Sequence, residues 1–545
     1  MAHASPTNRI MFLHLPNHMT LPSVRRVWSW IVVIGCAHVL ALLSFHLAQF
    51  PGLHGDEAWL GLFTLRIRDR GLYSPHEMNT YTGSLYAWLL SWVFTYFPPD
   101  VFSLRIGGVL LNGVAMVIAT RHFAKRFGLG GALVWLYLLG TSALFVFKSR
   151  LAWEVTALQN LLLTGILVLC ARFLEDKRCA FGSVLAFLVL NYIGVINHFI
   201  FISVPVSLTM VVLVQMIFRD DGELGDFCRL SLCNGLMAAL VFLIKSQITE
   251  TQWQHHQYFF TVLSLLIPLG FASAYVWTGP RMDHWLRTLC TRHLGTPLAR
   301  TLFKRGLAFG LVLFCGFHLK ALVQVWSAVV LFEHLASWSP PLFLQLVLYA
   351  WACSLLGTFA LYTYRRLEPG TFSRLSPYAR LLALWPVIYL AVFILFRDRS
   401  HIRYYILPSF LIMASLTAAL SRIDWTTHRW VAAVYLGVAA VLNLCFWGEI
   451  ARPSPRPPLV HRIGWHLERS ADFLPKDALY QTFVREKVCT FQAANFFINL
   501  PLAFYLHVHP IANCDRTKVI TVQDCPECPN PPYFTWTIMS LPAEP

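Results

Sequence analysis

The sequence predicts an all-α polytopic membrane protein, with about thirteen transmembrane helices and a small α/β domain after them. Of the 545 residues, 57% are hydrophobic and only 13% are charged. Soluble domains carry about a quarter charged residues, so a chain this apolar does not fold as one water-soluble core. Apolar runs of roughly 20 residues recur along the chain, and this length crosses a bilayer. The last part of the chain, beyond about residue 451, is more polar.

The apolar runs place the expected spans. No small-residue cleavage site ends the first run, so we expect it to be a retained helix and not a removed signal peptide. The apolar segment 84–97 is short for a span, and we expect it to form a helix on the membrane surface or a re-entrant helix. The expected spans are 27–48, 102–121, 129–147, 155–173, 181–196, 199–218, 229–247, 257–277, 306–331, 341–363, 381–396, 402–420 and 430–448.

Charge predicts the topology. With the N-terminal segment 1–26 in the cytoplasm, the basic loops 121–126, 172–178, 281–305 and 365–380 all face inward, as the positive-inside rule requires. The net charge of +16 therefore reflects clusters of Lys and Arg between spans, which argues against a nucleic-acid partner. An odd number of spans within 27–450 places the C-terminal end of the chain outside.

A proline-rich stretch at 452–458 marks a domain boundary. We expect 451–545 to form a soluble extracytoplasmic domain, with strands at 478–484, 519–522 and 535–541.

The C-terminal domain also contains four cysteines, whereas no other expected outer loop contains one. In an oxidising compartment four cysteines can form two disulfides, and the sequence leaves the pairing open. The alternative is a zinc site at the CxxC pair, but no second ligand pair is evident. The four cysteines are Cys489, Cys514, Cys525 and Cys528.

An acidic pair opens the first outer loop, 49–101. Asp56 and Glu57 follow the first span directly, and a helix with Trp59, Phe63 and Ile67 on one face comes next. Such a helix would press onto the bilayer or the bundle and hold Asp56 near its positive end, at the membrane surface. The alternative is that Asp56 is a helix N-cap and Glu57 an ordinary acid of the first turn.

Several motifs follow this pair in a fixed order. Together with Gly-Asp-Glu-Ala-Trp at 55–59, they resemble the GT-C glycosyltransferases of the protein O-mannosyltransferase and aminoarabinose-transferase kind. The chain departs from the aminoarabinose branch at Tyr81-Thr-Gly, where that branch has Lys-Pro-Pro, and at Glu154, where it has Asp. The further motifs are the aromatic segment 81–88, the span start 98–107, Lys-Ser-Arg-Leu-Ala-Trp-Glu at 148–154 and Arg-Tyr-Tyr-Ile-Leu-Pro at 403–408.

The resemblance implies a membrane enzyme that takes a sugar from a polyprenyl-phosphate donor. It would transfer the sugar to a glycolipid, polysaccharide or protein acceptor on the outer face of the membrane. Asp56 would be the base that deprotonates the acceptor hydroxyl, and Glu57 would hold Asp56 or the acceptor. Glu154 would bind an acceptor group or join Asp56 in holding a divalent metal ion, and the sequence leaves open whether an ion is needed.

The donor phosphate needs fixed positive charge. Cations at the outer ends of spans are the candidates, and the alternative for each is contact with lipid headgroups. We expect Tyr81, Tyr86 and Tyr404 to bind substrate, and His198 to be a hydrogen-bonded packing residue. The candidate phosphate ligands are Arg105, Lys148, Arg150, Arg397, Arg399, His401 and Arg403.

Other classes of membrane protein compete with this interpretation. A transporter or flippase would show internal repeats, which are not evident. A polysaccharide polymerase or ligase would place its key Arg and His residues in later outer loops. A non-enzymatic scaffold with an outer disulfide domain is opposed only by the coincidence of Asp56, Glu154 and the basic residues at the outer ends of the spans. We expect the bacterial inner membrane as the location, because the chain has no evident retention signal for the endoplasmic reticulum.

Overall fold

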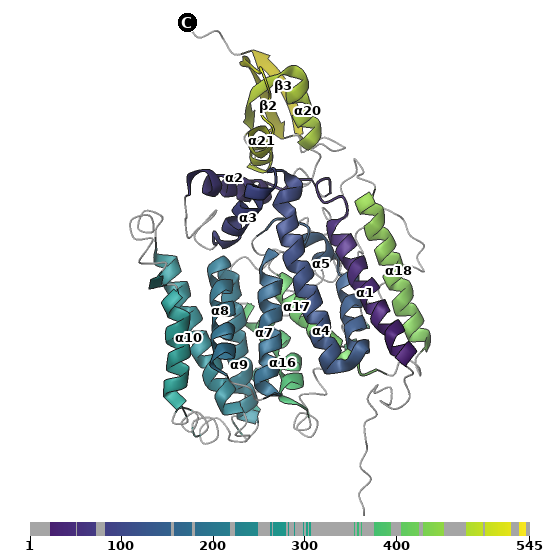
Figure 1. Ribbon diagram of the computed structural model, residues 1–545, viewed down its shortest axis with the longest axis vertical. Helices are drawn as coiled ribbons and strands as arrows, with labels where there is room; N and C mark the ends of the chain where they lie inside the picture. Colours follow the sequence, from purple (N-terminus) through teal and green to yellow (C-terminus); the bar gives the residue numbers. More distant parts are fainter. Residues whose placement is uncertain are drawn as a thin grey trace, which may run out of the picture.

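A computed structural model shows a helical bundle with a small mixed α/β unit at one end (Figure 1). It describes residues 22–50, 52–71, 82–153, 157–176, 180–218, 224–248, 265–279, 375–393, 405–423, 429–451, 476–493, 496–524 and 534–540, with isolated residues between 262 and 361.

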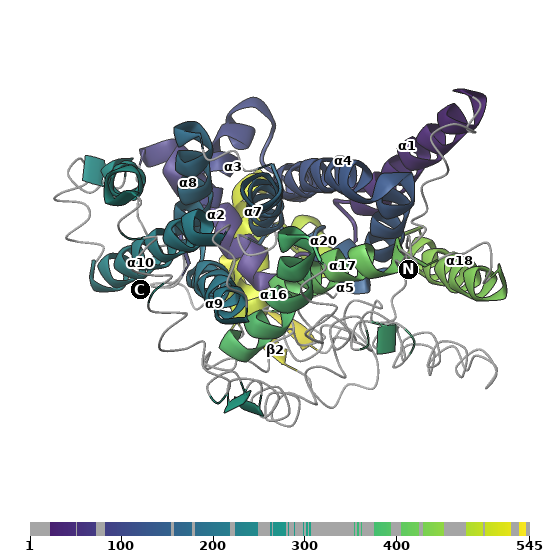
Figure 2. The same ribbon diagram turned by 90° about the horizontal axis from the view of Figure 1, so that it is seen from below.

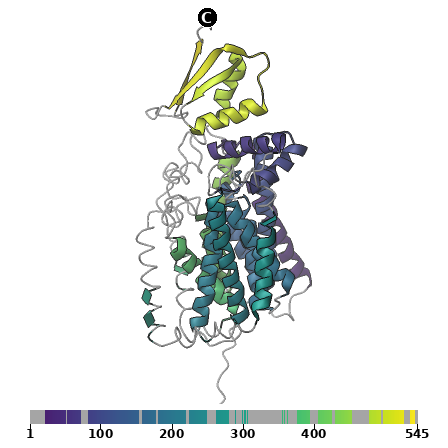
Figure 3. The ribbon, with the colours of Figure 1, turned by 90° about the vertical axis from the view of Figure 1, so that its left-hand side faces the viewer.

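The bundle consists of long apolar helices that run side by side (Figures 1 and 3). Within the described residues, 5 helices are long and apolar enough to cross a membrane, and several shorter apolar helices pack beside them. The predicted class, a helical integral membrane protein, is confirmed, whereas the count of thirteen spans stays a prediction. The bundle helices are α1 (Pro22–Ser44), α4 (Val101–Thr141), α5 (Ala143–Lys148), α7 (Gln159–Leu174), α8 (Phe181–Asn197), α9 (Ser203–Phe218), α10 (Gly225–Gln247), α16 (Pro377–Phe393), α17 (Ile406–Leu420) and α18 (Arg429–Ala451).

The helix α4 covers two of the expected spans, 102–121 and 129–147. Between them Gly128 has a φ of 73° and a ψ of −178°, which is outside the helical region. Glycine adopts a positive φ at little steric cost because it has no Cβ atom. The break between the two spans is therefore at Gly128, and Ser142 then caps the short helix α5 with its side chain.

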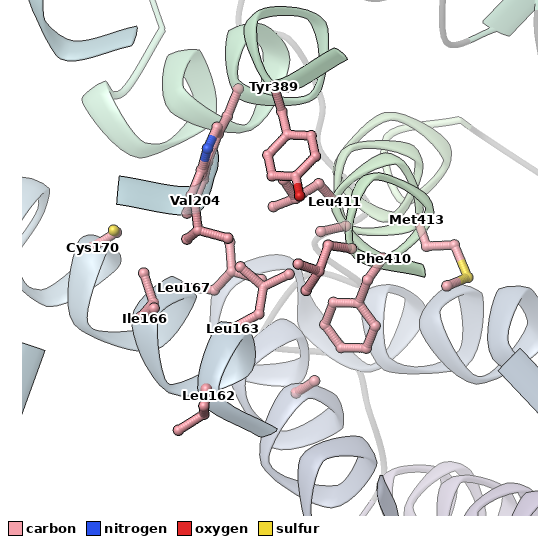
Figure 4. Packing of buried hydrophobic residues seen from close by; sticks show 14 of the residues in the cluster. Leu162, Leu163, Ile166, Leu167, Cys170, Val204, Tyr389, Phe410, Leu411 and Met413 are labelled. Atoms are coloured by element: carbon pink, nitrogen blue, oxygen red, sulfur yellow. The ribbon is translucent and has the colours of Figure 1, made fainter. Parts of the chain in front are cut away.

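The centre of the bundle is packed with apolar side chains from α7, α9, α16 and α17 (Figure 4). Viewed from below, α7 lies among α4, α8, α16 and α17 (Figure 2). The polar groups in this region bond to one another, since Trp385 Nε1 donates to Ser207 Oγ at 2.9 Å and Ser203 Oγ donates to the Tyr389 hydroxyl at 2.6 Å. Such internal pairing is what an apolar environment without water requires.

Two short helices lie across one end of the bundle, α2 (Gly55–Arg70) and α3 (Leu85–Tyr96) (Figure 1). The segment 84–97 was expected to be a surface or re-entrant helix, and α3 occupies it. Side chains of both helices share one apolar cluster, which includes Leu60, Leu65, Leu90 and Leu104.

The C-terminal unit has its own apolar core, which includes Leu479, Phe483, Leu502 and Ile520. Its sheet has the order β1-β2-β3, with β1 and β2 parallel and β2 and β3 antiparallel. The elements are α20 (Lys476–Glu486), β1 (Val488–Ala493), α21 (Phe496–Val508), β2 (Asp515–Asp524) and β3 (Phe534–Ser540).

The expected strands 519–522 and 535–541 correspond to parts of β2 and β3, but the expected strand 478–484 is wrong. That segment lies in α20, where Leu479 and Phe483, four residues apart, are both fully buried. This spacing is helical and not the alternation of a strand. A disulfide between Cys489 and Cys514 joins β1 to the turn before β2 and confirms one expected bridge. Cys525 and Cys528 lie outside the described residues.

The C-terminal unit packs on α2 through its helix α21 (Figure 3). Phe504 of α21 is fully buried, and its ring lies directly over Gly61 of α2. A Cβ atom at position 61 would be only 2.4 Å from Cε2 of this ring. The helix α2 is therefore enclosed between the bundle and α21.

We expect Gly61→Ala to destabilise the contact between α2 and α21. The added methyl overlaps the Phe504 ring, and overpacking of this kind costs about 1–3 kcal/mol. Thermal unfolding of the detergent-solubilised protein, with protease release of the C-terminal unit as a second readout, measures the effect. Gly437→Ala in α18 is the control, because a methyl added there would meet no atom within 4 Å and should be neutral or slightly stabilising. A higher melting temperature for Gly61→Ala, as well as for Gly437→Ala, would contradict the predicted overlap between position 61 and the Phe504 ring.

Candidate active site

The start of α2 is fixed by a capping box around His54. The Nδ1 atom of His54 accepts the N–H of Asp56 at 3.0 Å, and Glu57 Oε2 accepts the N–H of His54 at 3.2 Å. These bonds satisfy backbone donors that a helix N-terminus leaves open. Asp56 therefore lies in the first turn and is not the N-cap, because His54 takes that position.

Glu57 forms a fully buried ion pair with Arg105 of α4. Arg105 Nε donates to Glu57 Oε1 and Arg105 Nη2 donates to Glu57 Oε2, each at 2.8 Å. The N–H of Ala152 adds a third bond to Glu57 Oε1 at 2.8 Å. The carboxylate thus ties α2 to α4 and to the segment that follows α5.

The remaining donors of Arg105 are used by the backbone of the loop between α1 and α2. Nη1 donates to the Leu47 carbonyl at 2.9 Å, and Nη2 donates to the Gly52 carbonyl at 3.1 Å. Because the side chain is fully buried and bonded in this way, it holds the loop and does not lie open to a donor phosphate. In this structure Arg105 positions the loop, and its expected phosphate-binding role stays a prediction.

Arg150 is a second buried cation that bonds to backbone carbonyls. It is fully buried and donates to the carbonyl oxygens of Leu42 (2.5 Å), Phe45 (2.7 Å) and Phe50 (2.9 Å). The Leu42 and Phe45 carbonyls lie at the C-terminal end of α1, where a cation is also favoured by the helix dipole, and the Phe50 carbonyl lies in the loop that follows. Burial, and next to it the charge of Arg105, lowers the pKa of Arg150 to about 9, so the guanidinium stays charged at neutral pH. Arg150 therefore caps the end of α1 in this structure, and its expected phosphate-binding role stays a prediction.

Lys148 lies beside the same site. Its Nζ atom is 4.3 Å from the centroid of the Trp153 ring, and the Trp153 ring contacts the His54 ring edge-on at 5.0 Å. Cation–π contact of this kind holds an ammonium group in place. Trp153 thus connects Lys148 to the residue that caps α2, and a phosphate-binding role for Lys148 stays a prediction.

Tyr86 has a packing position in this structure, and its expected substrate-binding role stays a prediction. Its side chain is only 1% exposed, and it lies against Gly108 of α4, where an added Cβ would be 3.0 Å from the Tyr86 hydroxyl. Tyr86 therefore packs α3 against α4.

Asp56 is the acid of the pair that reaches the surface. Its side chain is 19% exposed, whereas that of Glu57 is fully buried, and its Oδ2 atom is 3.8 Å from His54 Nδ1. A carboxylate that is partly exposed and carried by a rigidly held helix turn can accept a proton or bind a cation. Nothing else among the described site residues combines these two properties.

The other expected site residues lie outside the described residues: Tyr81, Glu154, Arg397, Arg399, His401, Arg403 and Tyr404. Within the described part of the chain, no group of three His, Cys, Asp or Glu residues could hold a metal ion. Glu57 is engaged by Arg105, and the expected metal pair of Asp56 with Glu154 stays a prediction.

Three residues of the site region were not singled out from sequence. His54 directly precedes the motif at 55–59, and histidine is not among the preferred N-cap residues; Trp153 lies inside the motif at 148–154, where no role was expected for it. Gly83 lies in a β-bridge formed by Thr82 with His198, where a Cβ atom would be 2.1 Å from the Ile196 carbonyl oxygen.

His198 is a hydrogen-bonded packing residue, as expected, because it is buried and its Nδ1 atom accepts the Ile200 N–H at 3.2 Å.

Fold and site together define a polytopic membrane protein with an acidic helix turn at one end of its bundle. No family model matches the sequence, and no curated protein sequence matches it.

The chain is similar to solved structures of ArnT from Cupriavidus metallidurans, one bound to undecaprenyl phosphate and one in the apo state. The first is 13% identical over 92% of this chain and 93% of the other, with a TM-score of 0.38. The second is 12% identical over 92% and 94%, with a TM-score of 0.35.

It is also similar to the archaeal oligosaccharyltransferase AglB from Archaeoglobus fulgidus, in complex with an inhibitory peptide and a dolichol-phosphate. That match is 13% identical over 77% of this chain and 55% of the other, with a TM-score of 0.40. ArnT and AglB are GT-C glycosyltransferases. Similarity at this level assigns no activity to the present chain.

We expect Glu57→Gln to lower the stability of the protein strongly. The substitution leaves the charge of Arg105 buried without its counter-ion, which typically costs about 3–5 kcal/mol. Thermal unfolding in detergent measures the loss. Asp69→Asn is the control, since Asp69 pairs with Arg68 at the surface, where such pairs contribute less than about 1 kcal/mol. Equal melting temperatures for the two variants would show that Glu57 does not offset the buried charge of Arg105.

Proposed function

We propose that the protein is a membrane glycosyltransferase that moves a sugar from a polyprenyl-phosphate donor to an acceptor hydroxyl, with Asp56 as the general base. The observation that carries the proposal is the placement of Asp56. It is a partly exposed carboxylate in the first turn of α2, one residue from a fully buried ion pair. The motif order around it resembles that of GT-C enzymes.

The position of α2 supports this role. The helix lies across the end of the apolar bundle, between the bundle and α21 (Figures 1 and 3). A lipid-linked donor has its sugar at the membrane surface, and an acceptor approaches from the aqueous side. A base at the end of the bundle is placed where the two would meet.

The reaction needs one base. Asp56 removes the proton from the acceptor hydroxyl as its oxygen forms a bond to the anomeric carbon of the donor sugar. The bond from that carbon to the phosphate oxygen breaks, and the electron pair leaves with the polyprenyl phosphate. The proton on Asp56 then passes to water or to the released phosphate.

The cations divide into two groups in this proposal. Arg105 and Arg150 position the loop and α2 and act through Glu57 and the backbone. Lys148, together with Arg397, Arg399, His401 and Arg403, supplies the positive charge that holds the donor phosphate, and Tyr81 and Tyr404 complete the substrate site. The acceptor is a glycolipid, a polysaccharide or a protein.

The site end of the bundle is the non-cytoplasmic side in this proposal, with the N-terminus in the cytoplasm and the C-terminal unit in the periplasm of a bacterial cell. The basic loops between the expected spans support this orientation. The Cys489–Cys514 disulfide supports it independently, because disulfides persist in oxidising compartments.

We expect Asp56→Asn to abolish sugar transfer with the fold intact. Loss of a general base lowers rates about 10²–10⁴-fold. The assay measures transfer from a radiolabelled polyprenyl-phosphate sugar to a membrane extract by the purified protein. Asp69→Asn on the same helix is the matched control and should retain wild-type activity, because Asp69 lies in the exposed last turn.

Equal transfer by wild type and Asp56→Asn would remove Asp56 as the base. No transfer by the wild-type protein with several donor sugars would favour a transporter or a scaffold instead.

A divalent ion, held by Asp56 and Glu154, is a separate part of the proposal. If an ion takes part, we expect EDTA to abolish transfer and Mg²⁺ or Mn²⁺ to restore it, since carboxylate oxygens suit these hard cations. Glu154→Gln should then raise the ion concentration needed for half-maximal activity. Full activity in EDTA would leave Asp56 as a base alone.

A further inference from the structure

The helix α7 carries a buried carboxamide without a hydrogen-bond partner. The side chain of Gln159 is 0% exposed, and within the described part of the chain neither its Nε2 nor its Oε1 atom has a partner. The amide of the next residue is used differently, because Asn160 Nδ2 donates to Asn112 Oδ1 of α4 at 2.8 Å. Burying an amide without hydrogen bonds costs free energy, so the Gln159 carboxamide is a candidate for binding a ligand.

Gln159 lies at the end of the bundle that carries the candidate site. The segment just before α7 belongs to this site, since the Ala152 N–H donates to Glu57 Oε1 at 2.8 Å. The Ala157 N–H then donates to the Trp153 carbonyl at 2.8 Å, and α7 begins two residues later and runs away from the site. The free carboxamide is therefore at the site end of α7.

The face of α7 that carries Gln159 points into the centre of the bundle. Leu163 lies one turn further along the same face, because residues four apart on a helix lie one above the other. Its side chain enters the core that Val204 of α9 and Leu411 of α17 also enter (Figure 4). The Gln159 carboxamide is thus directed towards α9, α16 and α17, away from the Asn112 contact on α4.

The helices α7 and α16 run antiparallel, which places the last residue of α16 at the same end of the bundle as Gln159. Ser376 Oγ, just before α16, donates to Glu175 Oε1, just after α7, at 2.8 Å. The opposite ends of the two helices, Phe393 and Gln159, therefore both lie at the site end. The stretch 394–404, which follows α16 in sequence, contains four of the cations to which the proposed function assigns the donor phosphate.

The chemistry of the free carboxamide selects among ligands. Nε2 only donates and Oε1 only accepts, so a ligand that satisfies both atoms must accept one hydrogen bond and donate another. An ionised phosphate only accepts and an ammonium group only donates, so each of them would leave one atom of the amide unpaired. Two adjacent hydroxyl groups of a sugar satisfy both atoms at once.

We propose that Gln159 binds the donor sugar through two adjacent hydroxyl groups, with Nε2 donating to one oxygen and Oε1 accepting from the other. The inference rests on the proposed function and deepens it, because it assigns part of the sugar specificity of the same site to a residue of α7. The side chain is fully buried, so the sugar displaces neighbouring side chains when it binds. The donor sugar is thereby one with adjacent free hydroxyl groups on the edge that faces α7.

The test is donor binding by the purified full-length protein in detergent, measured by isothermal titration calorimetry. The probes are undecaprenyl phosphate and its glucose, mannose and galactose esters, which share the lipid and differ in the sugar. We expect wild type to bind at least one ester. Gln159→Leu should weaken that binding roughly tenfold or more, because two hydrogen bonds are lost, and should leave the affinity for undecaprenyl phosphate unchanged.

Gln215→Leu is the matched control. Gln215 of α9 is also buried, and in the described residues its two amide atoms have no partner. It lies twelve residues after Ser203, the first residue of α9, which is roughly 18 Å further from the site end. Both variants remove an unsatisfied polar group, so the protein without ligand should melt at the same or a higher temperature. Gln215→Leu should bind every probe as wild type does.

The outcomes separate the inference from the proposed function. Equal affinity of wild type and Gln159→Leu for the esters would overturn the inference and leave a buried water as the partner of the amide. An equal loss of affinity for undecaprenyl phosphate and for the ester would also overturn it, since the effect would not come through the sugar. Wild type that binds undecaprenyl phosphate but none of the esters would overturn it too. If wild type binds none of the probes, the proposed function fails and the inference fails with it.

Discussion

The buried ion pair between Glu57 and Arg105 is the interaction on which the geometry of the candidate site depends. It joins the first turn of α2 to α4, and the same two side chains bond to Ala152 and to the loop carbonyls of Leu47 and Gly52. Removing two charges from water is expensive, so such a pair contributes little net stability. Its effect is on position, because a fully bonded buried pair admits one arrangement of the segments that it joins.

The adjacent acids Asp56 and Glu57 have different environments because neighbouring residues on a helix point about 100° apart. Glu57 faces the bundle and meets Arg105, while Asp56 remains partly exposed. The first carboxylate is thereby available for chemistry and the second fixes the backbone that carries it. Arg150 has a comparable supporting role at the end of α1, where it occupies carbonyls that the helix leaves open.

Much of this could be predicted from the sequence, and the failures have physical causes. Apolar runs indicated the membrane class and the short helix α3, because burial in a bilayer imposes length and composition. The partners of Arg105 and Arg150 were not predictable, because a motif gives the charge of a side chain and not the carbonyls that tertiary packing brings to it. The segment of α20 was mistaken for a strand because a short apolar run does not by itself distinguish strand from helix. The number of spans stays open because run lengths near the limit are ambiguous.

The contact of Phe504 with Gly61 has a consequence for biosynthesis. The two residues are separated by most of the chain, so α2 is made and inserted long before the helix that covers it leaves the ribosome. Contacts between distant parts of a chain form late, since a long loop must close first. The site is therefore completed only when synthesis ends, and a truncated chain would carry the acidic turn of α2 without its cover.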